Sequence, residues 1–152
     1  MLRNGYYGKY KDKIYPITIL QNKGIVYVMS NNLDDLHKGF EKNTSYSEST
    51  RFLYHKYHKS VLISDIEWFC RIKTYGYYKG YKVWISGETD TEYSICSGPV
   101  SADQKVFTKE NGFKEMDRYL FIGEVPKNEI TEFFEIKTPI NENYKVPDNW
   151  DF

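Results

Sequence analysis

The chain contains an internal repeat, which restricts it to folds that can be built from two copies of a small unit. Three phrases return later in the sequence: GYYGKYK (5–11) as GYYKGYK (76–82), KGFEK (38–42) as NGFKE (111–115), and DIEWFCRIKT (65–74) as EITEFFEIKT (129–138). The copies lie 71, 73 and 64 residues apart. Unequal offsets indicate insertions and deletions, so we predict two related units that differ in their loops.

The ends of these phrases give the predicted domain boundaries. The first repeat covers residues 1–74, the second covers residues 75–138, and residues 139–152 form a C-terminal tail that begins a third copy and stops. A chain of 152 residues has the length of one ordinary domain or of two very small ones.

Each unit is predicted to begin with a β-hairpin. Segments 13–20 and 24–30 are rich in β-branched and aromatic residues, and QNKG (21–24) between them is a turn signal. Segments 81–86 and 91–97 repeat this order in the second unit. The pattern therefore predicts paired strands in both halves of the chain.

The remainder of each unit combines helical turns with further strands. We expect short helices within 31–40 and 101–113, the latter with capping-box spacing between Ser101 and Gln104, a mobile polar loop at 41–51, third strands at 51–58 and 118–125, helical turns within 64–69 and 127–134, and last strands at 70–74 and 134–138. Short strands, tight turns and one late helical turn are typical of small barrels. We predict a mainly β fold of two tandem SH3-like small β-barrel repeats with short helical turns.

Composition narrows the class of protein. Lys plus Arg and Asp plus Glu both number 21, and this neutral balance argues against a general nucleic-acid binder. The N-terminus lacks an apolar signal-peptide region, and no apolar run approaches the length of a membrane span. Cys70 and Cys96 lie in apolar or strand-like runs without C-x-x-C spacing, which indicates buried, reduced thiols; a disulfide is the alternative. We expect a cytoplasmic protein with no membrane contact.

No catalytic signature is present in the sequence, so we predict that the protein is not an enzyme and needs no cofactor or metal. His55 and His58 in YHKYH would share a face on a helix, but on the strand that we predict they point to opposite faces. Cys96 would need a neighbouring base to act as a nucleophile. A pair of carboxylates brought together by the fold remains an open alternative.

Two groups of residues are candidate partner-binding sites. Read as a strand, GETDTEY places Glu88, Asp90 and Glu92 on one face, where an acidic stripe would meet a basic partner; the alternative is a solvated hairpin tip. Trp150 is an apolar anchor in the polar tail, which either folds back or reaches a partner.

Tyrosine and tryptophan supply the second candidate site. Tyr77, Tyr78 and Trp84 suit a groove for proline-rich peptides or a cage for a cation, as in SH3-like or tudor-like readers. The alternative is that these rings lie in the core and in packing between the units.

A family resemblance adds an expectation about function. The YKG phrase and the pattern V-x-x-x-[DE]-I-x-x-F-x-x-IKT, at Val61–Thr74 and Val125–Thr138, resemble small cytosolic proteins encoded beside polymorphic LXG-type toxins of Firmicutes such as Bacillus and Listeria. The resemblance implies an immunity protein, which binds the toxic domain of a cognate toxin and occludes it without catalysis. Many such toxins are nucleases with basic clefts, which suits an acidic stripe.

The predicted function is therefore that of a cytosolic protein-binding module, an immunity protein that acts as a toxin inhibitor through protein–protein interaction. The alternative is an SH3-like module that binds peptides or cell-wall material. A small hydrolase would require carboxylates or Cys96 in a concave pocket.

Overall fold

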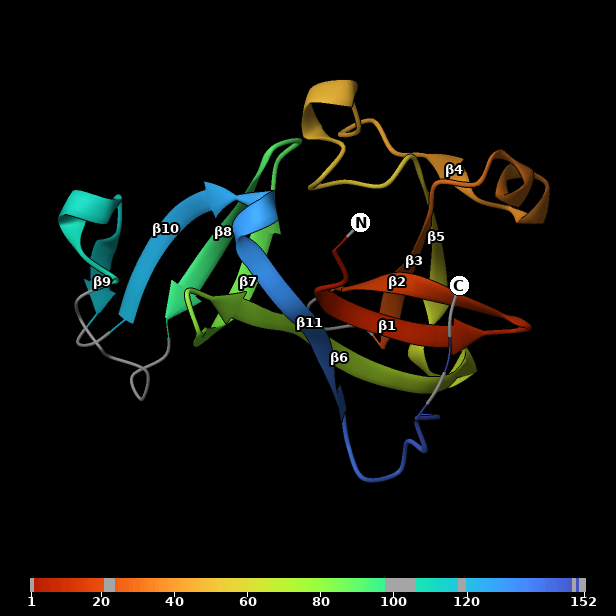
Figure 1. Ribbon diagram of the computed structural model, residues 1–152. Coiled ribbons are helices and arrows are strands. Elements are labelled where there is room, and N and C mark those ends of the chain that lie inside the picture. Colours follow the sequence, from red (N-terminus) through yellow and green to blue (C-terminus); the bar gives the residue numbers. More distant parts are fainter. Residues whose placement is uncertain (1, 21–23, 98–105, 118–119, 149, 151–152) are drawn as a thin grey trace. The chain divides into compact units, whose positions relative to one another are not determined.

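The computed structural model describes residues 2–20, 24–97, 106–117, 120–148 and 150, and it is mainly β, with 56% of these described residues in strands. The strands are β1 (Gly5–Tyr10), β2 (Lys13–Ile19), β3 (Ile25–Ser30), β4 (Glu41–Lys42), β5 (Tyr57–Leu62), β6 (Ile66–Tyr78), β7 (Tyr81–Glu88), β8 (Glu92–Ser97), β9 (Lys114–Asp117), β10 (Leu120–Pro126) and β11 (Ile130–Pro139) (Figure 1). The 3-10 helices are η1 (Leu33–Lys38), η2 (Glu48–Thr50), η3 (Ile63–Asp65), η4 (Lys109–Asn111) and η5 (Lys127–Glu129). The prediction of a mainly β fold is confirmed.

The chain divides into two compact units. One unit consists of Gly5–Ile72 and Lys137–Phe152 and is called the 5–72 unit here. The other consists of Lys73–Ile136 and Met1–Asn4 and is called the 73–136 unit. Each unit therefore takes a short segment from the far end of the chain.

Both units have the same strand order. In the 5–72 unit the order is β4-β5-β3-β2-β1-β6, and in the 73–136 unit it is β9-β10-β8-β7-β6-β11. The long strand β6 belongs to both orders: its residues 66–72 pair with β1, and its residues 75–78 pair with β7. Among the described residues the ladder ends at β4 and at β9 without joining, so the sheet is open and closed barrels are not confirmed.

The register shows which residues of the two units are equivalent. Tyr10 pairs with Lys13 across a two-residue turn, and Tyr78 pairs with Tyr81 across another. The first turn residue has positive φ in both, 54° at Lys11 and 49° at Lys79. Equivalent positions here are thus 68 residues apart. The offset of 71 between the opening phrases is therefore wrong by three residues. The error arises because these Tyr- and Lys-rich segments can also be aligned three residues out of register.

The other two offsets, 64 and 73 residues, relate segments that have the same structure in both units. At the offset of 64, η3 leads into β6 as η5 leads into β11. At the offset of 73, η1 and η4 both end at a glycine with φ 87° and ψ 12°, Gly39 and Gly112. A buried phenylalanine follows each glycine, Phe40 and Phe113. Glycine suits this left-handed backbone, which lets the chain reverse and insert the ring into the core.

A strand glycine lies beneath two isoleucines in each unit. A Cβ at Gly8 would lie 2.6 Å from Ile17 Cδ1 and 3.0 Å from Ile66 Cγ2. A Cβ at Gly76 would lie 3.2 Å from Ile85 Cδ1 and 2.7 Å from Ile130 Cγ2. These isoleucines are themselves equivalent and buried, so each glycine lets the last strand of its unit approach the first.

Each unit has its own apolar core. The core of the 5–72 unit contains Tyr15, Ile17, Val26, Val28, Phe40, Val61, Ile66 and Phe69. The core of the 73–136 unit contains Tyr78, Val83, Ile85, Ile95, Phe107, Phe113, Val125 and Ile130. Cys70 and Cys96 are both buried and are not joined in a disulfide, as predicted. Among the described residues, no helix has the length and apolar character needed to cross a membrane.

A second apolar cluster of the 5–72 unit contains the C-terminal tail. Tyr144, Val146 and Trp150 of the tail pack on the face formed by Tyr7, Ile14, Trp68, Cys70 and Ile72. The Trp150 ring lies 5.1 Å from the Trp68 ring and 6.2 Å from the Tyr7 ring, measured between centroids. The tail therefore folds back, which is one of the two outcomes considered for Trp150.

Several local predictions require correction. The helical turns within 64–69 and 127–134 shorten to η3 and η5, because Ile66 and Ile130 already begin β6 and β11. The third strand of the first unit begins at Tyr57, and residues 51–53 form a turn instead. The polar segment 41–51 contains β4 and η2. Of the helix predicted within 101–113 the structure describes η4, while Ser101 and Gln104 lie outside the described residues.

The glycine packing gives a stability prediction. Gly8→Ala and Gly76→Ala should each lower the free energy of unfolding by about 1–3 kcal/mol, because the added methyl group meets packed isoleucines. Gly87→Ala is the matched control, since its Cβ would lie 3.7 Å from Ser94 Oγ, an ordinary contact. The measurement is urea unfolding followed by circular dichroism. Equal effects at all three glycines would contradict the packing described.

The tail gives a second prediction. Trp150→Ala should lower the free energy of unfolding by about 2 kcal/mol, because it removes an indole packed on Tyr7 and Trp68. Trp84→Ala is the comparison, with less than half that effect expected because Trp84 packs against Lys73, whereas Trp150 packs against two aromatic rings. A negligible loss for the Trp150 variant in thermal unfolding would show that the tail adds little to the 5–72 unit.

Candidate binding face

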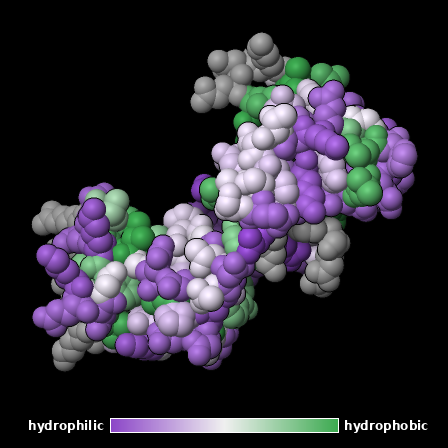
Figure 2. All heavy atoms as spheres, turned by 90° about the horizontal axis from the view of Figure 1, so that it is seen from above, coloured by the Kyte–Doolittle hydropathy of each residue, from purple (hydrophilic) through white to green (hydrophobic). Residues whose placement is uncertain are grey.

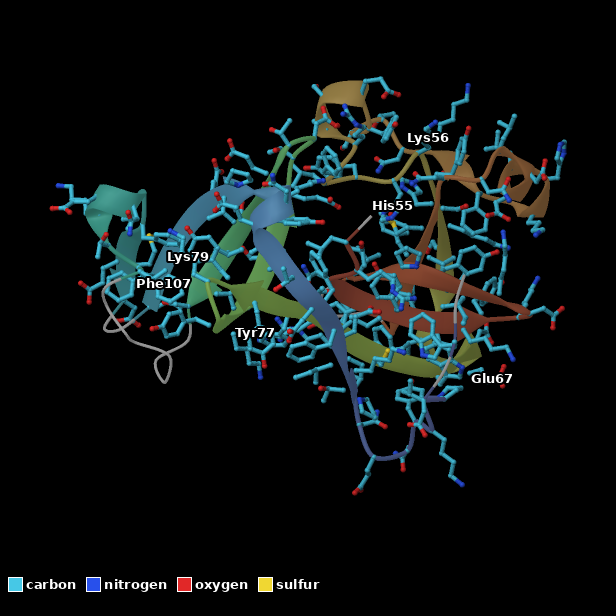
Figure 3. The ribbon with its side chains drawn as sticks, viewed as in Figure 1. His55, Lys56, Glu67, Tyr77, Lys79 and Phe107 are labelled. Atoms are coloured by element: carbon cyan, nitrogen blue, oxygen red, sulfur yellow. The ribbon has the colours of Figure 1, made fainter. Side chains whose placement is uncertain are left out.

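The face of the 73–136 unit that points away from its core carries a group of aromatic and basic side chains. Along β6 and β7 the alternation of a strand sends Gly76, Tyr78, Val83 and Ile85 inward. It sends the remaining side chains to the opposite face, where Phe134 of β11 joins them. We define the aromatic face as Lys73, Tyr75 and Tyr77 of β6, Lys82 and Trp84 of β7, and Phe134 of β11; Tyr77 is labelled in Figure 3.

The rings of this face are in direct contact. Tyr75 and Phe134 stack, with centroids 5.5 Å apart and planes 16° from parallel. Tyr77 meets the same phenylalanine at 6.3 Å in a tilted arrangement. Offset and tilted pairs at these distances are favourable and hold the rings in a continuous platform.

Lysines lie over the rings. Lys82 Nζ is 4.7 Å from the Tyr75 centroid and 5.4 Å from the Phe134 centroid. Lys73 Nζ is 4.9 Å from a ring of Trp84. Cation–π attraction operates at these distances. The ammonium groups thus occupy the positions that a bound cation would need, and they make the face positively charged.

The equivalent face of the 5–72 unit is covered, and this contrast marks the aromatic face as a candidate site. Tyr7 is equivalent to Tyr75 because each precedes a packed strand glycine, and it is 6% exposed beneath the tail. Tyr75, Tyr77 and Phe134 are instead half-buried, and Lys82 is exposed. In the hydropathy view, hydrophobic patches lie among hydrophilic side chains (Figure 2).

Trp84 brings an unsatisfied donor to this face. Its indole Nε1 is buried, and among the described residues no atom accepts a hydrogen bond from it. A buried N–H without an acceptor costs about 1–3 kcal/mol.

A hollow of about 300 Å³ borders Phe134. It is lined by Leu2, Arg3, Thr74, Tyr93, Phe133, Phe134 and Glu135. Arg3 and Glu135 form a two-point ion pair on its wall, in which Arg3 Nε donates to Glu135 Oε2 at 2.8 Å. Phe133 is 50% exposed and meets the Tyr93 ring edge-on at 5.7 Å. Apolar and charged side chains therefore line this hollow beside the aromatic face.

The structure separates the aromatic residues singled out from the sequence. Tyr77 and Trp84 lie on the aromatic face, whereas Tyr78 lies in the core, 4% exposed, against Phe107 and Phe113. Sequence reasoning missed Tyr75 and Phe134. The strand alternation places Tyr75 on the same face as Tyr77, and that pattern could have identified it.

The acidic residues do not form a stripe on one strand. Glu88 ends β7 and Glu92 begins β8, with Asp90 in the turn between them, so the premise of a single strand is wrong. The Glu88 side chain is 8% exposed and accepts hydrogen bonds from Lys127 Nζ and Leu2 N, each at 2.8 Å. Whether this hairpin contacts a partner stays a prediction.

The pKa of Glu88 reflects this pairing. Burial acts to raise the pKa, but the hydrogen bonds from Lys127 and Leu2 and the charge of Lys127 outweigh it, so the pKa of Glu88 lies below its ordinary 4.5. Glu88 is therefore a negative charge that is already neutralised inside its own unit, while Asp90 is exposed and Glu92 is half-buried.

The groups considered for catalysis or metal binding come from different segments of the chain. His58 is on β5 and stacks on Tyr27, while His55 precedes that strand, and burial lowers the pKa of His55. Burial raises the pKa of the Cys96 thiol, which outweighs the opposite effect of its hydrogen bond to Ser86. Within the described part of the chain no three His, Cys, Asp or Glu side chains gather as metal ligands.

Comparison with known proteins places the chain in a family. It belongs to the family described as uncharacterised conserved protein UCP033725, whose family model matches residues 2–143. No curated protein and no solved structure matches the chain. The match spans both units, so the matched region contains both copies of the strand order.

The Glu88–Lys127 pair gives a pH-dependent prediction. Glu88→Gln should lower the free energy of unfolding by about 1–2 kcal/mol at pH 7, because Lys127 loses its charged partner. A carboxylate with a lowered folded pKa stabilises above its unfolded pKa, near 4.5, and this contribution is lost as the pH falls through the folded pKa. The difference between wild type and variant should therefore narrow below pH 4.5 in urea unfolding. A constant difference from pH 7 to pH 3 would contradict the assignment.

Proposed function

We propose that the protein is a non-catalytic protein-binding module whose aromatic face receives an extended segment of a partner protein. The observation that carries this proposal is the contrast between the units. The tail covers one copy of the face with aromatic and apolar anchors, Tyr144, Val146 and Trp150, and the described residues leave the other copy half-exposed.

The chemistry of the face indicates the kind of segment it takes. Stacked rings accept apolar and aromatic anchors, and the tail shows that a segment containing proline fits such a face. Lys73 and Lys82 favour acidic groups beside those anchors. The preferred ligand is therefore an extended, acidic segment with spaced aromatic residues.

We also propose that the units are SH3-like. In each unit three sequential strands form a meander, a further strand joins the third, and a 3-10 turn leads into a last strand that returns to the first. This order supports an SH3-like relationship. SH3-like modules bind peptides in aromatic-lined grooves.

Within this class, the role we propose is that of an immunity protein that neutralises a cognate toxin by occluding its toxic domain. The resemblance at Val61–Thr74 and Val125–Thr138 supports this role. Because the aromatic face carries lysines, we expect the toxin surface that contacts it to be acidic. The hairpin that contains Asp90 remains the candidate site for basic groups of the toxin. The alternative is a module that binds peptides or cell-wall material.

A peptide titration tests the binding face directly. The probe is a synthetic peptide with the sequence of residues 139–152, PINENYKVPDNWDF, titrated into the full chain and followed by NMR. We expect the Trp84 indole N–H signal to shift, because the tail already covers the other copy of the face. Tyr77→Ala combined with Phe134→Ala should weaken binding at least tenfold, since each aromatic contact is worth about 0.5–1.5 kcal/mol beyond its buried area.

The matched control is Tyr54→Ala, which removes a ring that is 41% exposed in the other unit. It should leave the affinity unchanged. Absence of any shift at Trp84, or an equal loss in the control, would refute the proposed face. The toxin role is tested separately by co-expression with candidate toxin domains from the neighbouring genes, where the Tyr77/Phe134 double variant should lose protection. Full protection by that variant would show that the aromatic face is not needed for immunity.

A further inference from the structure

The 5–72 unit contains a pocket that is lined by lysines and that the proposed function does not use. It has a volume of about 270 Å³ and is formed by the β1–β2 turn, the end of η1 and β5. Its lining residues are Tyr10, Lys11, Asp12, Lys13, Tyr15, Lys38, Phe40 and Lys59. Four ammonium groups thus come from three separate segments of the chain.

These lysines are held in place by aromatic rings and by the backbone. Lys11 Nζ and Lys59 Nζ lie 5.4 and 5.5 Å from the Tyr10 centroid, and Lys59 Nζ donates to the Lys38 carbonyl oxygen at 2.9 Å. Lys13 Nζ lies 5.6 Å from the Tyr15 centroid. Neither Lys11 nor Lys59 has a carboxylate within ion-pair distance in the part of the chain that the structure describes.

A buried carboxylate anchors the other two lysines. Asp35 is 0% exposed, and its oxygens lie 3.4 Å from Lys13 Nζ and 3.2 Å from Lys38 Nζ. The Ser30 hydroxyl also donates to it. Burial acts to raise the pKa of Asp35, but the Ser30 and Lys38 hydrogen bonds and the charge of Lys13 outweigh it and keep the pKa below its ordinary value. Asp35 is therefore an anion that positions Lys13 and Lys38 from behind the pocket.

The charges do not balance within the pocket. Four lysines stand against two carboxylates, Asp12 on the lining and Asp35 behind it, which leaves an excess of two positive charges. Like charges in one small volume repel each other unless an anion joins them. The Tyr15 hydroxyl stays neutral, because burial and the nearby Asp35 raise the pKa of Tyr15 to about 12.

The equivalent place in the 73–136 unit is filled with aromatic rings. Phe107 lies there, 5.1 Å from Phe113, 5.9 Å from Tyr81 and 6.2 Å from Tyr78, between centroids (Figure 3 labels Phe107 and Lys79). Tyr81 stands where the 5–72 unit has Lys13. The same strand arrangement is thus filled by apolar packing in one unit and leaves a lysine-lined pocket in the other. The pocket is therefore not required for this strand arrangement to fold.

We propose that this pocket binds a compact phosphate-bearing ligand with two or more phosphate charges. Lysine ammonium groups bind phosphate oxygens as point charges, and the excess positive charge matches such an anion. Because Lys11 and Lys59 both lie against the Tyr10 ring, that ring is not free to stack on a base. Recognition therefore rests on the phosphates, and inorganic pyrophosphate and a nucleoside diphosphate should bind alike.

The experiment is calorimetric titration of the full chain with inorganic pyrophosphate and, in a second arm, with adenosine diphosphate. Both should bind, with affinities within about threefold of each other because the phosphates dominate recognition. Lys11→Gln combined with Lys59→Gln should weaken pyrophosphate binding at least tenfold. The matched control is Lys79→Gln combined with Lys109→Gln, two exposed lysines of the other unit, which should leave binding unchanged.

Distinct results would overturn the proposal. Absence of pyrophosphate binding at low ionic strength, or equal weakening in both double variants, would exclude a site at this pocket. If sulfate at matched ionic strength raised the melting temperature of the protein as much as pyrophosphate does, the stabilisation would be a general effect of salt. Much tighter binding of adenosine diphosphate than of pyrophosphate would show that the pocket recognises the base rather than the phosphates. Circular dichroism of the Lys11/Lys59 variant establishes that it is folded, and the peptide-binding face lies in the other unit, so the two proposals fail independently.

Discussion

The close packing of two isoleucines on a strand glycine is the constraint on which each unit depends. Ile17 and Ile66 occupy the space above Gly8, and Ile85 and Ile130 occupy the space above Gly76. This contact lets the last strand return to the first strand after the 3-10 turn. It also fixes the register, because a shift of one residue would replace the glycine with a tyrosine or a lysine and send the core residues to the opposite face. The repeated strand order follows from that register.

The two copies of this frame differ in what fills their surfaces. Phe107 closes the 73–136 unit where lysines line the 5–72 unit, and the tail covers the face of the 5–72 unit whose counterpart holds Tyr75 and Phe134. A duplicated frame supplies its own internal control, since the closed copy shows that the opening in the other is not imposed by the fold. Both openings are rimmed by lysines, although the whole chain is neutral. The local charge therefore decides what each opening can bind.

Much of the strand content was predictable from the sequence, because the repeated IKT phrases and the alternating aromatic residues are strong signals of paired strands. The long strand β6 was harder to recognise. Ser64 and Glu67 have capping-box spacing, which favours a helical turn, but pairing with β1 prevails from Ile66 onward. The opening repeat was placed three residues out of register because tyrosine and lysine recur too often in it.

The candidate sites were less predictable than the fold. Tyr77 and Trp84 follow from strand alternation, but their neighbour Phe134 lies far along the chain, and only the pairing of β11 with β6 brings it close. Glu88 looked like a free surface acid because sequence does not show that Lys127 returns to meet it. The lysine pocket depends on Asp35, whose burial behind the β1–β2 turn has no signature in the sequence.

The equivalent faces of the two units differ in their cover, and hydroxyl-radical footprinting of the free protein measures this difference. Mass spectrometry would compare the oxidation rates of Tyr75, Tyr77 and Phe134 with those of Tyr7, Trp68 and Cys70. The account predicts rapid modification of the first group and protection of the second, with Tyr7 becoming reactive in the Trp150→Ala variant. Equal protection of both groups would contradict an open aromatic face on the 73–136 unit.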